Sequence, residues 1–188
     1  GQITVLGMGT SEVTAKFGSM DAKGSITVNV EELPDPAPVP TVPAVNVISL
    51  FSNAYTNVPV DTWATGWLYS TAVLNEIQIE GDDVKLYTTL NFNGIEFASQ
   101  TIDATQMTHF HMDIWTPDDV MSKSLSIKNV DFGGGSSEAT SHILTVVHTA
   151  SGDIPALATG SWVSIDVPLT AFTGNLTRAD LAQMVLTC

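Results

Sequence analysis

The sequence predicts an all-β protein whose main part is a β-sandwich or jelly roll. Its apolar residues come in short runs rich in Val, Ile, Thr and Phe, and residues 25–30 alternate apolar and polar side chains. Turn-forming pairs such as Asn93-Gly94 separate these runs. With 44% hydrophobic and 14% charged residues, the chain can bury a core. No run approaches the ~20 apolar residues that span a bilayer, so membrane insertion is not expected.

Residues 1–32 are predicted to form three short strands, at 3–6, 12–17 and 24–30. Three strands in so short a block cannot enclose a sandwich core. We therefore expect that this block does not fold alone. It needs further strands from upstream in a longer chain, or it must dock on another surface.

Residues 33–45 are predicted to be a linker, because five of the nine prolines lie there. Proline lacks a backbone donor and fixes φ, so the segment should be extended and semi-rigid. This composition marks the clearest domain boundary in the sequence.

Residues 46–188 are predicted to form one domain of many short strands with a single helical turn. The turn is expected at 177–183, where Thr177 would cap it and Asp180 occupies the capping-box position. The expected strands are 47–51, 76–79, 84–92, 95–98, 109–115, 124–130, 142–148, 162–168 and 184–187.

The net charge of −14 restricts the partners of the chain. An acidic surface repels phosphate, which argues against nucleic acid and anionic membranes as partners. Neutral ligands and metal cations remain compatible with it. Cys188 is the single cysteine, so no internal disulfide is possible, and this favours a bacterial origin if the protein is secreted.

Two segments resemble known families. The motifs Ile3-Thr4-Val5-Leu6-Gly7 and Gly24-Ser25-Ile26-Thr27-Val28-Asn29-Val30 resemble the C-terminal half of a bacterial Ig-like (BIG2-type) domain. The stretches Asn46-Val47-Ile48-Ser49-Leu50-Phe51-Ser52-Asn53-Ala54-Tyr55-Thr56, Phe92-Asn93-Gly94-Ile95-Glu96-Phe97, His109-Phe110-His111-Met112-Asp113-Ile114-Trp115-Thr116-Pro117 and Trp162-Val163-Ser164-Ile165-Asp166-Val167-Pro168-Leu169 resemble jelly-roll carbohydrate-binding modules appended to Bacteroidetes family 16 glycoside hydrolases. The fold implied is a partial Ig-like domain, a Pro-rich linker and a jelly-roll β-sandwich.

The second resemblance implies non-catalytic binding of a polysaccharide, a β-glucan or a marine galactan, by part of a large secreted or cell-surface protein. Such modules close with a strand that helps to hold structural calcium, and here the chain stops at Thr187-Cys188. Asn53 stands where the pattern has a carboxylate, so the calcium site is in doubt. Other domains of the same longer chain are the remaining partners implied.

A sugar site needs an aromatic face for the C–H patches of the sugar and planar polar groups for its hydroxyls. The predicted strand at 109–115 places His109, His111, Asp113 and Trp115 on one face. This face suits a sugar platform, but an ordinary outer face and a second core layer are alternatives. His109, His111 and Asp113 could also form a metal site, although such sets arise often by chance.

The aromatic stretch 61–69 is predicted to be a loop at one end of the sandwich. We expect one of Trp63 and Trp67 to be buried as a core lid and the other, Trp67, to contact ligand. Tyr87 and Asn91 share a face of the predicted strand 84–92 and are further candidates. Asp131, before Gly133-Gly134-Gly135, could bind calcium through oxygen, with a solvated turn acid as the alternative.

No catalytic motif or clustered carboxylate pair is recognisable, so the sequence predicts no enzyme. A structural or adhesive module without a glycan ligand is the alternative function. The two hypotheses differ in whether Trp67, Trp115 and Tyr87 are exposed and line one groove.

Overall fold

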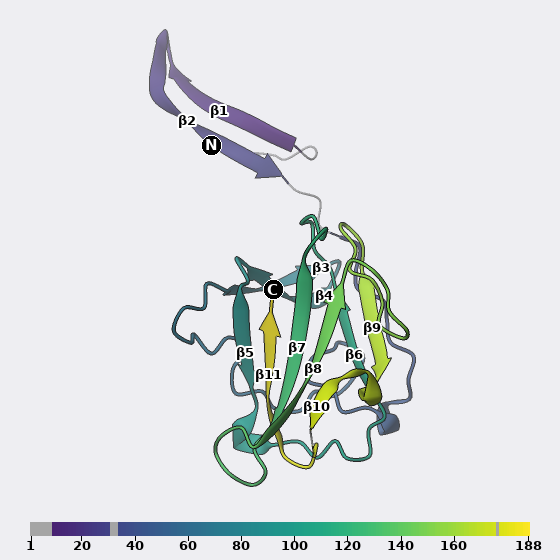
Figure 1. Cartoon of the computed structure of the whole chain (residues 1–188). Helices are drawn as coiled ribbons and strands as arrows, with labels where there is room; N and C mark the ends of the chain where they lie inside the picture. Colours follow the sequence, from purple (N-terminus) through teal and green to yellow (C-terminus); the bar gives the residue numbers. More distant parts are fainter. Residues whose placement is uncertain (1–8, 31–33, 176) are drawn as a thin grey trace. The chain divides into compact units, whose positions relative to one another are not determined.

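The computed structural model describes residues 9–30, 34–175 and 177–188, and these residues are mostly β-strands (Figure 1). The chain forms two compact units, residues 1–34 and 35–188, which are described separately. The helical elements of the described residues are three-residue 3₁₀ turns, too short to cross a bilayer: η1 (Ala44–Asn46), η2 (Ala98–Gln100) and η3 (Leu169–Ala171). The all-β fold class predicted from the sequence is therefore confirmed.

The first unit contains an antiparallel hairpin of β1 (Gly9–Phe17) and β2 (Met20–Val30). Gly18 at its turn has φ +61°, a conformation that favours glycine. The turn exposes two apolar side chains, Phe17 and Met20, which pair across it. These strands correspond to the predicted 12–17 and 24–30, and the predicted strand 3–6 lies outside the described residues.

The second unit consists of three antiparallel assemblies. The five-stranded sheet has the order β10-β8-β7-β11-β5, and Figure 1 shows β5, β11, β7 and β8 side by side. The ladder β6–β9 and the hairpin β3–β4 complete the unit. The bounds are β3 (Val73–Ile79), β4 (Asp82–Thr88), β5 (Phe92–Glu96), β6 (His109–Ile114), β7 (Ser124–Asp131), β8 (Thr140–Val147), β9 (Val163–Pro168), β10 (Thr173–Asn175) and β11 (Leu181–Thr187).

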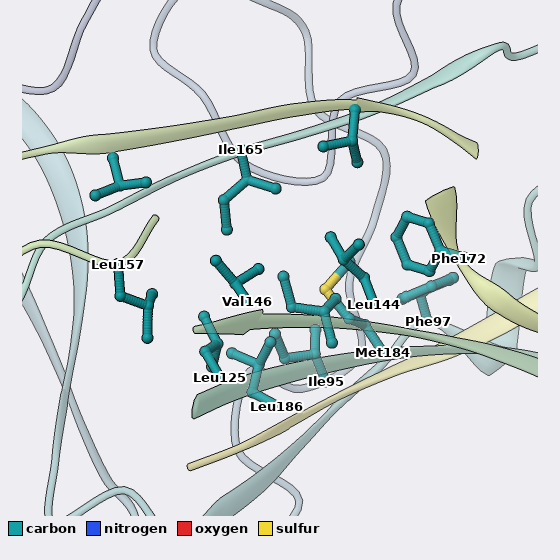
Figure 2. Packing of buried hydrophobic residues seen from close by; sticks show 13 residues of the cluster. Ile95, Phe97, Leu125, Leu144, Val146, Leu157, Ile165, Phe172, Met184 and Leu186 are labelled. Atoms are coloured by element: carbon teal, nitrogen blue, oxygen red, sulfur yellow. The ribbon is translucent and has the colours of Figure 1, made fainter. Parts of the chain in front are cut away.

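The core lies between the five-stranded sheet and the β6–β9 ladder. Side chains of a strand alternate between its two faces, and every second residue of β7, β8, β9 and β11 is buried. Figure 2 shows Ile165 of β9 across the core from Leu144 and Val146 of β8. The buried cluster comprises Ile95, Phe97, Leu125, Ile127, Leu144, Val146, Leu157, Val163, Ile165, Val167, Phe172, Met184 and Leu186. The residues between these positions lie on the opposite faces of their strands, and one of them, Val130 of β7, is also buried, in a second cluster with Phe132 and Ala182.

The expected strands 47–51 and 84–92 are wrong in the structure. Residues 84–92 are divided between β4 and β5, because Thr89 has φ +50° and the chain turns there. In 47–51 a single parallel bridge, Ser49 to Asn57, is present instead of a strand. The β3–β4 turn is Glu80-Gly81, where both residues have positive φ, as a type I′ turn requires.

The expected helical turn at 177–183 is also wrong, and the cause is a buried carboxylate. The Oδ2 atom of Asp131 accepts hydrogen bonds from Thr177 Oγ1 at 2.7 Å and from the backbone N–H of Asp180 at 3.0 Å. The Thr177 hydroxyl is therefore not free to cap a helix, and β11 begins at Leu181.

From Asp35 onward, the Pro-rich segment belongs to the second unit rather than to a separate linker. Two side chains anchor its backbone carbonyls. Trp162 Nε1 donates to the Asp35 carbonyl at 2.7 Å, and the Tyr55 hydroxyl donates to the Val42 carbonyl at 2.7 Å. These bonds replace the intrasegment hydrogen bonds that proline cannot form.

Candidate functional site

The outer face of the five-stranded sheet, on the side away from the core, is the first part of the candidate site. The strand register aligns the outward positions in rows. Two of the rows are Gly94, Val185, Lys128, Ile143 and Thr173, and Phe92, Thr187, Ser126 and Thr145; a third contains Glu96, Gln183, the buried Val130 and Ser141. The hydroxyls of Ser126 and Thr145 lie 3.4 Å apart across β7 and β8. The outer face thus presents the hydroxyl groups of Ser126, Thr145, Thr173 and Thr187 beside the larger side chains of Phe92, Lys128 and Ile143.

Trp67 lies at the β5 edge of this outer face. A Cβ atom built on Gly94 would point outward and stand 2.7 Å from Cη2 of the Trp67 indole and 2.8 Å from the Thr65 side chain. The glycine therefore leaves the space that the indole occupies. The backbone N–H of Thr65 donates to the Gly94 carbonyl at 3.1 Å and fixes this approach. Trp67 is consequently half-buried against β5 rather than free in a loop.

Residues 66–71, the Tyr69 loop, present two exposed side chains next to this edge. Leu68 is 77% exposed and Tyr69 is 81% exposed. Tyr69 has φ +71°, which for a bulky residue costs ~1–2 kcal/mol. Neighbouring hydrogen bonds must offset this cost for the conformation to persist.

The hydrogen bonds that hold the Tyr69 loop come largely from one side chain. Asn91 Nδ2 donates to the Tyr69 carbonyl at 2.8 Å, and Asn91 Oδ1 accepts the N–H of Thr71 at 2.8 Å and that of Phe92 at 2.7 Å. The Ser70 hydroxyl adds a bond to the Phe92 carbonyl at 2.7 Å. The tyrosine ring is thus displayed on a backbone that is tied to the start of β5.

Asn91, one of the ligand-binding candidates named from the sequence, instead directs both ends of its amide to the backbone. Both amide atoms are occupied by the backbone of the Tyr69 loop and of β5. Its role is to position Tyr69.

Trp63 and Tyr87 are in contact with each other, and Trp63 lies on the core side of the domain. The Tyr87 hydroxyl donates to the Trp63 carbonyl at 2.7 Å, and Asn93 Nδ2 donates to the same oxygen at 2.8 Å. Trp63 packs against the core and meets the Phe51 ring edge to face, with 5.5 Å between centroids. Burial raises the pKa of Tyr87 to about 12. Tyr87 is therefore partly buried, and its hydroxyl is used to hold the Trp63 backbone.

The residues predicted on β6 lie in the opposite layer, on the outer side of the β6–β9 ladder. His109 and His111 are exposed, and His111 Nε2 lies 3.1 Å from Asp113 Oδ2. This hydrogen bond raises the pKa of His111. The Ser164 hydroxyl donates to Asp113 rather than to a histidine, so the set lacks the contact that activates a serine nucleophile.

Trp115 follows the end of β6 and is partly buried. Since Trp67 lies on the five-stranded sheet and Tyr87 points at Trp63, the three aromatic residues do not line one groove. The sugar platform expected along 109–115 is thus separated from Trp67 by the core.

The two residues considered for calcium, Asn53 from the resemblance and Asp131 from its place before the glycine turn, are both engaged in hydrogen bonds within the protein. Asp131 is fully buried, and Gly133 N–H, Thr177 Oγ1 and Asp180 N–H all donate to its carboxylate. Burial alone would raise the pKa of Asp131, but these hydrogen bonds outweigh it and lower the pKa. Asn53 Oδ1 instead accepts the N–H of Asp83 at 3.4 Å. Among the described residues, no group of three or more His, Cys, Asp or Glu is arranged for a metal.

Sequence reasoning predicted an aromatic loop but missed which aromatic residue it exposes. A loop has no periodicity to distinguish inward from outward residues, and the left-handed backbone at Tyr69 has no local signal. Trp67 and Tyr69 at the β5 edge, beside the polar outer face, are the groups that the structure brings together. Comparisons with protein-family models, with curated proteins and with solved structures found no match to this chain.

Proposed function

We propose that residues 35–188 form a non-catalytic polysaccharide-binding domain, in which the glycan lies across the outer face and stacks on Tyr69 and Trp67. The observation that carries the proposal is Tyr69: its ring is 81% exposed on a strained, firmly hydrogen-bonded backbone. Exposed aromatic rings held in fixed positions are common anchors for ligands, because ordering them on binding costs little entropy.

The chemistry of the two parts of the site is complementary to that of a sugar chain. The Tyr69 ring offers a flat apolar face for C–H patches, and the half-buried Trp67 continues the aromatic edge along β5. The hydroxyls of Ser126, Thr145 and Thr187 offer hydrogen bonds to sugar hydroxyls across the sheet.

The charges favour a neutral glycan over a polyanionic one. Three of the basic side chains in this unit are already engaged: Lys85 with Glu76, Lys128 with Glu138, and Arg178 with the Met107 carbonyl. With a net charge of −14 on the whole chain, an alginate or sulfated chain would be repelled. A β-glucan of the laminarin type or an uncharged marine galactan such as agarose is therefore the proposed ligand.

The wider setting follows the resemblance stated above. We propose a jelly-roll module in a large secreted or cell-surface bacterial protein, with an Ig-like block before it. The domain would keep that protein close to its polysaccharide without breaking any bond.

Affinity electrophoresis of the whole chain through gels that contain laminarin, agarose, xylan or alginate tests the proposal. We expect retardation by a neutral glycan, its loss in Tyr69→Gly, and no change in Met121→Ala, which removes another exposed apolar side chain. Retardation that survives in folded Tyr69→Gly would disprove the stacking role. Binding to alginate alone would contradict the charge argument.

A structural or adhesive module is the second candidate. Its support is that Trp67, Trp115 and Tyr87 are all partly buried and share no groove, while the β1–β2 hairpin exposes Phe17 and Met20 at its turn. A folded sample that none of the four gels retards would favour this function.

A further inference from the structure

A separate hollow of about 460 Å³ opens at the β3–β4 hairpin. Its lining includes Phe51, Glu76, Gln78, Asp83 and Lys85. The volume falls within the ~300–1,000 Å³ typical of small-ligand sites. The hollow involves neither Trp67 nor the Tyr69 loop. Gln78 is five residues along β3 from Val73, where the strand leaves that loop, or ~17 Å at ~3.3 Å per residue.

The strand register gathers four polar side chains of the hollow on one face. Glu76 pairs with Lys85 across the hairpin, and Gln78 pairs with Asp83. Gln78 Nε2 donates to Asp83 Oδ1 at 2.8 Å, and Lys85 donates to the Glu76 carboxylate. These contacts hold the groups in place. They leave Gln78 Oε1 and Asp83 Oδ2 without a hydrogen-bond partner among the residues that the structure describes.

Phe51 forms the aromatic wall of the hollow. Its ring is 37% exposed, and Trp63 supports it edge to face. The Lys85 ammonium lies 4.8 Å from the Phe51 centroid and 4.9 Å from the Trp63 ring, within cation–π range. The Lys85 side chain is only 15% exposed, and its charge is satisfied by these rings and by Glu76. The groups of the hollow left for a ligand are therefore the exposed part of the Phe51 side chain and the planar oxygens of Gln78 and Asp83.

We propose that this hollow is a second saccharide site, which takes one or two sugar units at the end of a neutral glycan chain. Phe51 would stack on the sugar, while Gln78, Asp83 and Glu76 would accept hydrogen bonds from its hydroxyls. A hollow of limited volume suits a chain end, whereas the outer face of the five-stranded sheet suits the interior of a chain. The inference rests on the proposed polysaccharide ligand and adds to it a site specific for chain ends.

A uronic acid or sulfated sugar is disfavoured at this site. Glu76 and Asp83 would face its charge, and the Lys85 ammonium that could neutralise it is already bound by Glu76 and the two rings. The same carboxylates accept hydrogen bonds from neutral hydroxyls, and such charge-assisted bonds are stronger than neutral ones.

Titration of the ¹⁵N-labelled whole chain with laminarihexaose, agarohexaose and xylohexaose, followed by amide shifts, tests the inference. We expect one hexaose to shift the amides of Gln78 and Asp83 as well as those of the Tyr69 loop. Shifts confined to the Tyr69 loop and β5 would overturn the second site and leave the proposed function standing. Shifts confined to the hollow would overturn the proposed binding at Tyr69 and Trp67 and leave the second site standing. The absence of shifts with all three hexaoses would overturn both sites.

A matched pair of variants provides the second measurement. Gln78→Ala removes a polar group of the hollow, whereas Asn75→Ala removes an exposed amide from the other face of the same strand. By calorimetry, Gln78→Ala should weaken binding of the shifting hexaose roughly two- to tenfold, the effect of one hydrogen bond, and Asn75→Ala should not change it. If Gln78→Ala and Asn75→Ala bind the hexaose with equal affinity, the proposed saccharide site in the hollow is overturned.

Discussion

Replacement of Tyr69 by glycine should remove glycan binding while leaving the domain as stable as the parent. At φ +71°, a non-glycine residue costs ~1–2 kcal/mol, and glycine removes that cost. Two losses oppose the gain: the extra freedom of glycine in the unfolded chain, ~0.4–1 kcal/mol, and the small buried part of the ring. About a fifth of a ring that would bury ~200 Å² gives ~1 kcal/mol. The terms cancel to within about 1 kcal/mol.

Tyr69→Ala isolates the backbone contribution, because both variants lack the ring and differ only in conformational preference. The alanine variant keeps the cost of a non-glycine residue at positive φ, but it lacks the extra freedom that glycine gives the unfolded chain. It should therefore be about 1 kcal/mol less stable than the glycine variant. Urea denaturation measures this as a midpoint ~0.3–1 M lower. If alanine is as stable as glycine, the backbone at residue 69 is not strained and the reasoning from strain to function fails.

Three further predictions concern other buried contacts. Asp131→Asn should lower the free energy of unfolding by ~2–3 kcal/mol in urea denaturation, because three donors lose a charged acceptor. An unchanged free energy would show that the carboxylate does not hold Gly133, Thr177 and Asp180 in place. Burial lowers the pKa of His142 to about 4, so the stability that its neutral form contributes is complete above pH ~6.5 and declines as the pH falls toward 4. In urea denaturation at several pH values, His142→Gln should reduce the loss of unfolding free energy between pH 6.5 and 5. The same loss in the variant and the parent would contradict this. Gly94→Ala should destabilise the domain by ~1–3 kcal/mol and shift its tryptophan fluorescence, since the new methyl group would displace the Trp67 indole, whereas parent-like spectra and stability would contradict the close packing.

The strands around the core could be predicted from the sequence because their environment is simple. In β8 and β9 one face meets the core and the other does not, and this gives the alternation seen at Ile165 and Val167. The end of the chain could not be predicted as well, because Thr177 and Asp180 match a helix cap locally. A carboxylate 46 residues earlier, Asp131, decides their hydrogen bonding instead.

The sequence predicted which aromatic residues belong to the candidate site, but not which of them are exposed. The aromatic stretch 61–69 indicated a binding loop, but the exposure of Trp67 depends on Gly94, a residue on another strand. The exposure of Tyr69 likewise depends on the amide of Asn91. Both are long-range contacts, and the sequence near the loop contains no signal for either.

The position of Tyr69 is the strongest physical argument for a binding role. Five non-glycine residues with positive φ are present in the described chain, and Tyr69 is the aromatic one among them. Its loop also contacts a second residue with positive φ, Thr89: the Thr71 hydroxyl donates to the Thr89 carbonyl at 2.7 Å. A loop that served only to connect strands would be at least as stable with glycine at residue 69, since the ring contributes little burial. Under the proposed function, the advantage of a bulky, exposed ring in a strained conformation lies outside the folded domain, in its contact with the glycan.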